Sequence, residues 1–144
     1  MKAIIQRVKK ATLYSDGEKY SEIKNGIIIL FGVSTTDKIE NVDKFTQKLL
    51  KLRIFDDEQG KTNKNIFDAK GEVLVISNFT LYANLKGTNR PDFVNVAKQD
   101  IAEEIYNKFC EELNKQIEIK TGVFRTYMEI ETVLDGPNTY ILEI

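Results

Sequence analysis

The amino-acid sequence predicts an α+β fold in which a mostly antiparallel β-sheet carries two main helices packed on one side. Two observations lead to this prediction. Strand-like segments separated by short turns occupy both ends of the 144-residue chain, and two amphipathic helical segments lie between them. Strands joined by hairpins form antiparallel sheets, and amphipathic helices bury their apolar stripes against a sheet face. We expect residues 1–144 to form a single domain, because this length with 42% hydrophobic residues suits one core.

The first part of the chain has the pattern of strands separated by tight turns. Residues Lys2 to Ser15 are rich in β-branched side chains, and the turn dipeptide Asp16-Gly17 separates them from a returning strand over Glu18 to Lys24. A second turn, Asn25-Gly26, precedes an apolar run from Ile27 to Val33. An unbroken apolar run predicts a strand covered on both faces, so we place it at the centre of the sheet.

The two helices are predicted from apolar residues at helical spacing. The first helix follows capping residues at Ser34 to Asp37, and its apolar positions are Ile39, Val42, Phe45, Leu49 and Leu52. The second is predicted to be capped by Asp92, and its apolar face comprises Phe93, Val96, Ala97, Ile101, Ile105, Phe109 and Leu113. Between the helices we expect short strands at Arg53 to Phe55 and Glu72 to Ile76, then a basic loop between Asn84 and Pro91.

The last part of the chain returns to β-structure. Strands are predicted over Ile117 to Lys120, Tyr127 to Leu134 and Thr139 to Ile144. The turn residues at Asp135 to Asn138 predict that the last two strands form a hairpin.

The absence of histidine narrows the possible chemistry. Histidine is the usual general base near neutral pH and the commonest transition-metal ligand, so catalytic triads that use it and histidine-based zinc sites are excluded. An enzyme with this sequence must use hydroxyls, carboxylates, backbone dipoles or groups that the substrate supplies. The sequence implies no cofactor and no metal.

Charge, cysteine content and hydropathy indicate compartment and partners. The single cysteine, Cys110, cannot form an internal disulfide, which suits the reducing cytoplasm where we place the protein. The longest apolar run, Ile27 to Val33, is far shorter than the roughly 18 to 20 residues that cross a bilayer, so we expect no membrane association. A formal net charge of −1 argues against coating of nucleic acid through bulk charge. We expect no DNA partner and only local contact with RNA.

Four stretches carry a resemblance to a known family. They are Met1 to Val8, Leu52 to Phe55, Ser77 to Tyr82 and Asp135 to Pro137, supported by Thr121-Gly122, Phe124 and Met128. Along its whole length the sequence resembles the D-aminoacyl-tRNA deacylases. The segment Ser-Asn-Phe-Thr-Leu is similar to the family's active-site motif Ser-Gln-Phe-Thr-Leu, and the Gly-Pro dipeptide matches the one that forms the family's chiral filter.

The resemblance implies a barrel-like homodimer that hydrolyses the ester bond of D-aminoacyl-tRNA, and of glycine mischarged on tRNA, without a cofactor. The catalytic residues it implies are Ser77, Asn78, Phe79 and Thr80. The substrate-binding residues it implies are Gly136, Pro137, Arg7 and Met128. Lys86 and Arg90, in the basic loop, are candidate contacts with the tRNA acceptor end.

The proposed filter has a physical basis. Gly136 lacks a Cβ, so a ligand can approach its backbone, and a cis Pro137 would turn neighbouring carbonyls the same way to hold an ammonium group. A backbone wall then meets the side chain of an L-amino acid but leaves room for hydrogen or a D side chain. In the family, Arg7 would hold this segment in place, and the Gly-Pro loop of one subunit would reach the pocket of the other.

Several positions depart from the family pattern and leave alternatives open. Asn78 replaces glutamine, Arg125-Thr126 replaces a small pair, and Leu134 and Asn138 replace asparagine and valine. A second hypothesis is therefore a protein that binds aminoacyl-tRNA, or another amino-acid conjugate, without hydrolysing it. Arg125 separates the two: a side chain that fills the pocket favours binding alone, and one that points outward favours hydrolysis. A plain structural dimer is the third alternative.

Overall fold

A computed structural model describes residues 1–87 and 89–144. The elements of the main sheet are β1 (Lys2–Ser15), β2 (Glu18–Ile23), β3 (Gly26–Gly32), β6 (Glu72–Ser77), β7 (Ile119–Thr121) and β8 (Met128–Glu143). A small second sheet pairs β4 (Phe55–Asp56) with β5 (Thr62–Lys64). The helices are α1 (Val42–Leu50) and α2 (Gln99–Asn114), with short 3₁₀ helices η1 (Ile39–Asn41) and η2 (Phe79–Tyr82).

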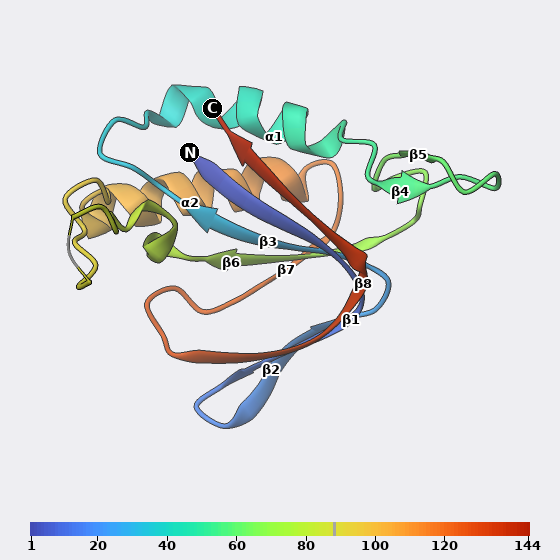
Figure 1. The fold of residues 1–144 in the computed structure, drawn as a ribbon, viewed down its shortest axis with the longest axis horizontal. Coiled ribbons are helices and arrows are strands. Elements are labelled where there is room, and N and C mark those ends of the chain that lie inside the picture. The colour runs from blue at the N-terminus through green and yellow to red at the C-terminus, as the bar shows by residue number, and fades with distance from the viewer. Residues whose placement is uncertain (88) are drawn as a thin grey trace.

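Strand β1 organises the sheet because it is long enough to pair with three other strands. Its first half pairs with β3, its second half pairs with β2, and β8 follows it along nearly its whole length. Figure 1 shows β1 and β8 bending together, so that β2 and one half of β8 form a layer opposite β6 and β7. The sheet is therefore nearly closed and barrel-like, as the family resemblance implies.

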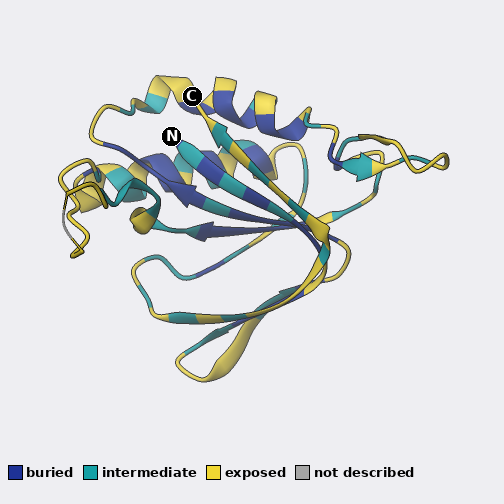
Figure 2. Ribbon diagram, in the orientation of Figure 1, coloured by how far each residue is buried: buried dark blue, intermediate teal, exposed yellow. Residues whose placement is uncertain are grey.

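Two hydrophobic cores follow from this bend. The larger core lies between the two helices and one face of the sheet, and it includes Ile27, Ile29, Phe31, Phe45 and Phe109. The smaller core lies inside the curved sheet, and its buried members are Val8, Ala11, Leu13, Ile23, Ile28, Leu74 and Ile76. Figure 2 shows β3 buried along most of its length. Its alternate residues enter the two cores, which confirms the prediction of a central strand covered on both faces.

The prediction of a mostly antiparallel sheet is wrong in part, because the sheet is mixed. The pairs β3–β6 and β6–β7 are parallel, whereas the pairs that β1 makes are antiparallel. The two helices explain the difference: α1 lies in the connection from β3 to β6, and α2 lies in the connection from β6 to β7. Helical crossovers return the chain in the same direction and so produce parallel neighbours. Both helices do pack on one side, as predicted.

The predicted hairpin at the end of the chain is also wrong. Residues Met128–Glu143 form one continuous strand, β8, and the predicted turn is a bulge within it. The span from Leu134 to Thr139 faces only the span from Val8 to Gln6 on β1, so extra residues loop outward at that point. Turn-forming residues mark a bulge and a hairpin equally well, and the length of β1 selects the bulge.

Both helices begin later than predicted. Asp37 accepts a hydrogen bond from the Ser34 backbone and pairs with the Met1 amino group, so it closes a local turn instead of capping α1. Asp92 forms an isolated antiparallel β-bridge with Asn84, and α2 begins only at Gln99. Phe93 is consequently outside the helix, although the sequence placed it on the helix's apolar face.

Smaller corrections concern the short strands. The strand predicted at Arg53 to Phe55 is observed at Phe55–Asp56, and the one predicted at Ile117 to Lys120 is observed at Ile119–Thr121. Among the described residues, no helix combines the length and the apolar character needed to cross a membrane.

Candidate functional site

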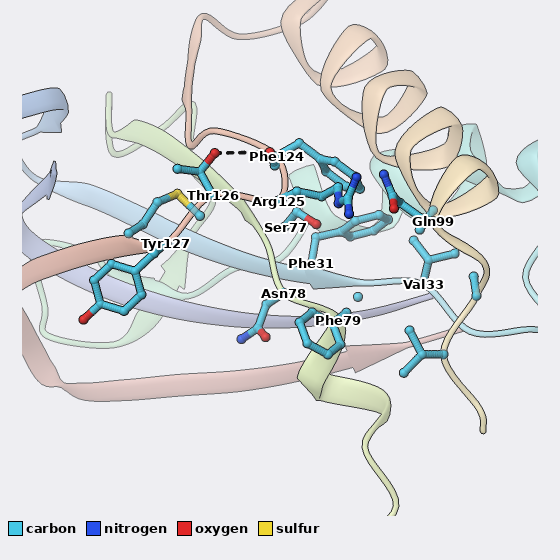
Figure 3. Close-up of a pocket in the computed structure, with 15 residues that line it drawn as sticks. Phe31, Val33, Ser77, Asn78, Phe79, Gln99, Phe124, Arg125, Thr126 and Tyr127 are labelled. Atoms are coloured by element: carbon cyan, nitrogen blue, oxygen red, sulfur yellow. Dashed lines mark hydrogen bonds between the residues drawn. The ribbon is translucent and has the colours of Figure 1, made fainter. Parts of the chain in front are cut away.

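A cavity of about 500 Å³ opens where β6 ends. It lies between the β6–η2 junction, the start of α2 and the segment that leads into β8 (Figure 3). Its lining residues are Phe31, Gly32, Val33, Ser77, Asn78, Phe79, Val96, Ala97, Gln99, Ala102, Phe124, Arg125, Thr126, Tyr127 and Met128. Ser77, Asn78, Phe79 and Met128, which the sequence selected, are therefore brought together in one pocket.

The polar edge of the pocket is built by a tight turn at the end of β6. Asn78 donates its backbone N–H to the Phe31 carbonyl at 2.8 Å, which continues the β3–β6 pairing by one step. The chain then enters η2. A Cβ on Gly32 would lie 3.0 Å from the Asn78 carbonyl oxygen and 3.0 Å from Leu81 Cβ, so a larger residue there would push the turn away from β3 by a few tenths of an ångström.

The Asn78 side chain caps this turn and holds Thr80. Its Oδ1 accepts the Thr80 backbone N–H at 3.2 Å and the Thr80 hydroxyl at 2.5 Å. An asparagine that accepts from the residue two positions later is a local cap that competes well with other backbone geometries. The N–H of Phe79, the first residue of η2, has no partner within the helix and belongs to a residue that lines the pocket. Thr80 itself is exposed and does not line the cavity.

Aromatic side chains form the floor and one rim of the pocket. Phe31 stacks on Phe109 with ring centroids 4.2 Å apart, so the floor is continuous with the larger core. At the rim, Phe79 remains 55% exposed and contacts Phe93 with centroids 5.2 Å apart. Flat apolar rings with one exposed face suit the stacking of a nucleobase.

The opposite wall is the segment before β8. The Val123 N–H contacts Met128 Sδ at 3.4 Å, and the Thr126 hydroxyl donates to the Phe124 carbonyl at 3.4 Å. Arg125 has a left-handed backbone with φ 61°, and its exposed side chain extends toward Gln99 in Figure 3. The arginine lines the pocket but leaves the cavity open.

Three of the four predicted substrate-binding residues lie outside this pocket. Gly136 and Pro137 are exposed in the β8 bulge, and neither they nor Arg7 line the cavity. The Gly136–Pro137 peptide bond is cis, as predicted. Asn138 Nδ2 donates to the Asp135 carbonyl at 2.9 Å and so closes the bulge.

Arg7 holds the bulge through Asp135, the residue before Gly136. Its side chain is only 8% exposed, and Nε lies 2.8 Å from Asp135 Oδ2, an ionic contact without hydrogen-bond alignment. NH2 lies 3.1 Å from Asp56 Oδ2, and NH1 donates to the Ile54 carbonyl at 3.0 Å. The hydrogen bond from Arg7 holds the pKa of Asp56 below its ordinary value. Arg7 therefore connects β1, the β4 region and the bulge.

Lys86 and Arg90 lie in an exposed loop whose ends meet at Asn84 and Asp92, where Asn84 Nδ2 donates to Asp92 Oδ2 at 2.8 Å. Thr88, in the same predicted basic loop, lies outside the described residues. The loop is followed by Phe93, whose ring contacts Phe79 at the pocket rim.

The described pocket contains hydroxyls and amides but no strong base. Cys110 lies away from the lining, and burial raises the pKa of its thiol to about 11, so it stays protonated at neutral pH. Any reaction in this pocket depends on positioned water, backbone dipoles or groups of the ligand.

Sequence reasoning missed the contribution of the α2 start to the pocket. Val96, Ala97, Gln99 and Ala102 line the cavity, although the sequence assigned Val96 and Ala97 only to a helix core. Phe93 and Ile101, near the start of α2, are apolar but remain exposed, which marks this end of the helix as open to a ligand. Helical spacing in the sequence does not predict that exposure.

A fold with a curved mixed sheet, two helices on one face and an open pocket of aromatic, hydroxyl and amide groups defines a small α+β ligand-binding or hydrolytic protein. Comparison with known proteins narrows this class. The family model described as D-Tyr-tRNA(Tyr) deacylase matches residues 4–143, and the chain belongs to this family.

Relatives and solved structures agree with this assignment. The chain is 43% identical over 143 residues to a D-aminoacyl-tRNA deacylase of Sulfurihydrogenibium sp. (strain YO3AOP1), covering 99% of this chain and 97% of the relative. It is 44% identical over 144 residues to one of Dictyoglomus turgidum, covering 99% and 92%.

Two solved structures have the same fold. One, described as c-Myc DNA Unwinding Element Binding Protein, has a TM-score of 0.93 and 40% identity and covers 100% of this chain and 99% of its own. The other, described as a probable eukaryotic D-amino acid tRNA deacylase, has a TM-score of 0.87 at 14% identity, covers 99% and 98%, and supports the fold alone.

Proposed function

We propose that this protein hydrolyses the ester bond of D-aminoacyl-tRNA, and of glycine mischarged on tRNA, releasing the free amino acid and tRNA. Membership of a deacylase family over residues 4–143 makes the chain an enzyme acting on aminoacyl-tRNA. The observation that carries the proposal is the pocket, where Ser77, Asn78 and Phe79 place hydroxyl and amide groups beside exposed aromatic rings. Rings of this kind suit a terminal adenosine, and the polar turn suits its ester.

The bonding of Thr80 supports a route without an acyl-enzyme. A threonine hydroxyl needs a base to become a nucleophile, and the Thr80 hydroxyl donates instead to an amide oxygen, which does not take up a proton at neutral pH. We infer that water attacks the ester carbon, assisted by the 2′-hydroxyl of the terminal adenosine. The bond from that carbon to the ribose 3′ oxygen breaks, and a proton ends on the departing oxygen. The Phe79 N–H would steady the developing oxyanion.

The Gly136–Pro137 segment is the proposed filter against L-amino acids, and it requires a second copy of the chain. Among the described strands, β8 pairs only with β1, so its other edge is unpaired. Apolar Val133, Leu134 and Ile141 are exposed along it, beside the bulge. An exposed apolar edge strand favours association. A twofold homodimer that buries this edge would carry the bulge of one subunit toward the pocket of the other.

The position of Arg125 favours hydrolysis over binding alone. Its side chain lies at the exposed wall of the pocket, and a cavity of about 500 Å³ stays open beside it. The proposal that this chain only binds its ligand would need Arg125 to occupy that space.

Lys86 and Arg90 are proposed as contacts with the tRNA acceptor end, because their loop leads into the pocket rim at Phe93. One structurally similar protein is named for binding a DNA unwinding element. For this chain we expect no DNA partner, on the ground of its net charge of −1.

The decisive experiment compares release of labelled D-tyrosine and L-tyrosine from charged tRNA. We expect rapid release of D-tyrosine and retention of L-tyrosine, with glycine released because it has no side chain to exclude. Equal rates for both enantiomers would contradict the filter, and tight binding without release would favour the alternative. Sedimentation at micromolar concentration tests the dimer, and a monomer would contradict the shared site.

A further inference from the structure

Arg125 is the one charged side chain among the described residues that line the pocket. The remaining lining residues are apolar, aromatic, hydroxyl-bearing or amide-bearing. A single cation at the wall of a mostly apolar cavity favours an anionic group on the ligand, because no other charged side chain of the lining competes for it.

The backbone of Arg125 adds a second observation. Its φ of 61° lies in the left-handed region, which residues other than glycine and asparagine rarely adopt. A turn fixes this conformation, since the Thr126 N–H reaches the Val123 carbonyl at 3.4 Å. A left-handed conformation at a residue that lines a pocket is a reason to test its side chain for a functional role.

Arg125 differs from Arg7 and Arg53 in its partners. Arg7 is paired with Asp56 and Asp135, and Arg53 donates to Asn63 Oδ1 at 3.1 Å. Arg125, by contrast, makes no ion pair with a carboxylate of the described residues. The guanidinium is therefore available to a ligand in the pocket.

We propose that Arg125 binds the phosphate on the 5′ side of the terminal adenosine of the substrate. This inference rests on the proposed function, which places that adenosine in the pocket. The ester-linked amino acid carries an ammonium group, which repels a guanidinium, whereas the phosphodiester next to the adenosine carries a negative charge. A guanidinium binds phosphate oxygens through two parallel hydrogen bonds, which fixes orientation as well as affinity. Arg125 thereby distinguishes a polynucleotide end from a free aminoacyl nucleoside.

Binding of two probes tests the proposal without any turnover. Adenosine 5′-monophosphate and adenosine differ only in the phosphate, and their dissociation constants are measured by NMR titration. We expect the wild-type protein to prefer the monophosphate by about tenfold, the effect of one charge-assisted pair. Arg125→Gly should bind both probes equally, and Arg125→Lys should keep part of the preference. Arg53→Gln, which removes an exposed arginine that does not line the pocket, should behave as wild type.

The variants are chosen so that folding does not obscure the result. Glycine and asparagine both tolerate a φ near 61°, so Arg125→Gly and Arg125→Asn should melt at or above the wild-type temperature. Loss of the phosphate preference in both folded variants supports the inference. A preference retained in either, or equal weakening of both probes, overturns it.

A kinetic arm separates the phosphate from the other anionic source, an acidic amino-acid side chain. Arg125→Gly should raise KM for D-tyrosyl-tRNA and D-aspartyl-tRNA by the same factor, about tenfold. A rise confined to D-aspartyl-tRNA would assign Arg125 to the amino acid and overturn the inference. If the wild-type protein releases no amino acid but prefers the monophosphate through Arg125, the proposed hydrolysis fails and the phosphate site stands.

Discussion

The Ser77 to Thr80 turn and the Gly136–Pro137 bulge were both predicted from the sequence to belong to the site, but they are held in different ways. The turn continues a buried parallel strand and is fixed by backbone hydrogen bonds and by the Asn78 cap. The bulge is exposed and is fixed by two side chains, Arg7 and Asn138. A site held by the backbone tolerates the loss of single side chains, whereas one held by side chains does not. Substitutions should therefore separate the two regions.

The largest loss of activity is expected from a substitution at Gly136. Its φ is 120°, and a Cβ would lie 2.1 Å from Asn138 Nδ2 and 3.0 Å from the Asn138 backbone nitrogen. Gly136→Ala must therefore displace Asn138 and break its bond to Asp135. We expect a loss of at least about a hundredfold in kcat/KM on D-tyrosyl-tRNA, equivalent to about 2.7 kcal/mol.

Gly17→Ala is the matched control, because Gly17 also has a positive φ, of 80°, but a Cβ at this position would have no atom within 4 Å. That variant should lose only about 1–2 kcal/mol of stability and keep its activity. Equal losses of activity in the two alanine variants would mean that backbone strain in general, and not the bulge, controls the rate.

A smaller effect is expected from Arg7→Gln, which removes the cation that joins the bulge to β4. Stability should fall by about 1–3 kcal/mol near neutral pH, because the Ile54 carbonyl and two carboxylates lose a charged partner. We expect kcat/KM to fall about tenfold as the bulge loosens.

The pH dependence of this difference is a sharper test. The hydrogen bond from Arg7 lowers the pKa of Asp56 below its ordinary 3.8. The contribution of this interaction to the free energy of unfolding is therefore fully present above pH 3.8, and it is lost as the pH falls through the lower pKa of the folded state. Urea unfolding between pH 3 and 6 should show the wild-type advantage narrowing at the acidic end. Arg53→Gln should show the same stability as wild type at every pH. A stability difference between Arg7→Gln and wild type that does not change with pH would contradict the proposed pairing of Arg7 with Asp56.

The fold was predictable where the pattern is local. The central strand at Ile27 to Val33 and the amphipathic helices follow from apolar periodicity, and their existence is confirmed. The parallel pairing and the continuous β8 were not predictable in this way, because both depend on which distant strand a segment meets. The turn residues at Asp135 to Asn138 encode a reversal or a bulge, and the long partner β1 decides between them.

The residues of the site were likewise predictable only where they are close in sequence. The sequence selected Ser77, Asn78 and Phe79, which the structure places in one pocket because they are consecutive at a strand end. It did not select Gln99 or Ala102, which reach the pocket only through the packing of α2. The part of the site proposed to lie between two subunits needs an association that neither periodicity nor motif spacing encodes.

The smallest effect on activity is expected at Thr80, although the sequence analysis predicts it to be catalytic. Its hydroxyl donates to Asn78 Oδ1 at 2.5 Å, and its backbone N–H reaches the same oxygen at 3.2 Å. Thr80→Ala keeps the second bond, so the turn and the Phe79 N–H should remain in place. Because the amide cannot act as a base, the hydroxyl is a positioning group, and we expect kcat to fall by less than about tenfold. Thr80→Ser, which keeps the hydroxyl, should match wild type.

Replacing the terminal 2′-hydroxyl of the tRNA with hydrogen should abolish turnover by wild type and Thr80→Ala alike, because the assisting group is then missing from the substrate. Single-turnover release of D-tyrosine from the two tRNAs measures this directly. An acyl-Thr80 adduct detected by mass spectrometry would overturn the assignment. Complete inactivity of a folded Thr80→Ala dimer that still binds substrate would do the same, since a group that only positions water slows the reaction without being required for it.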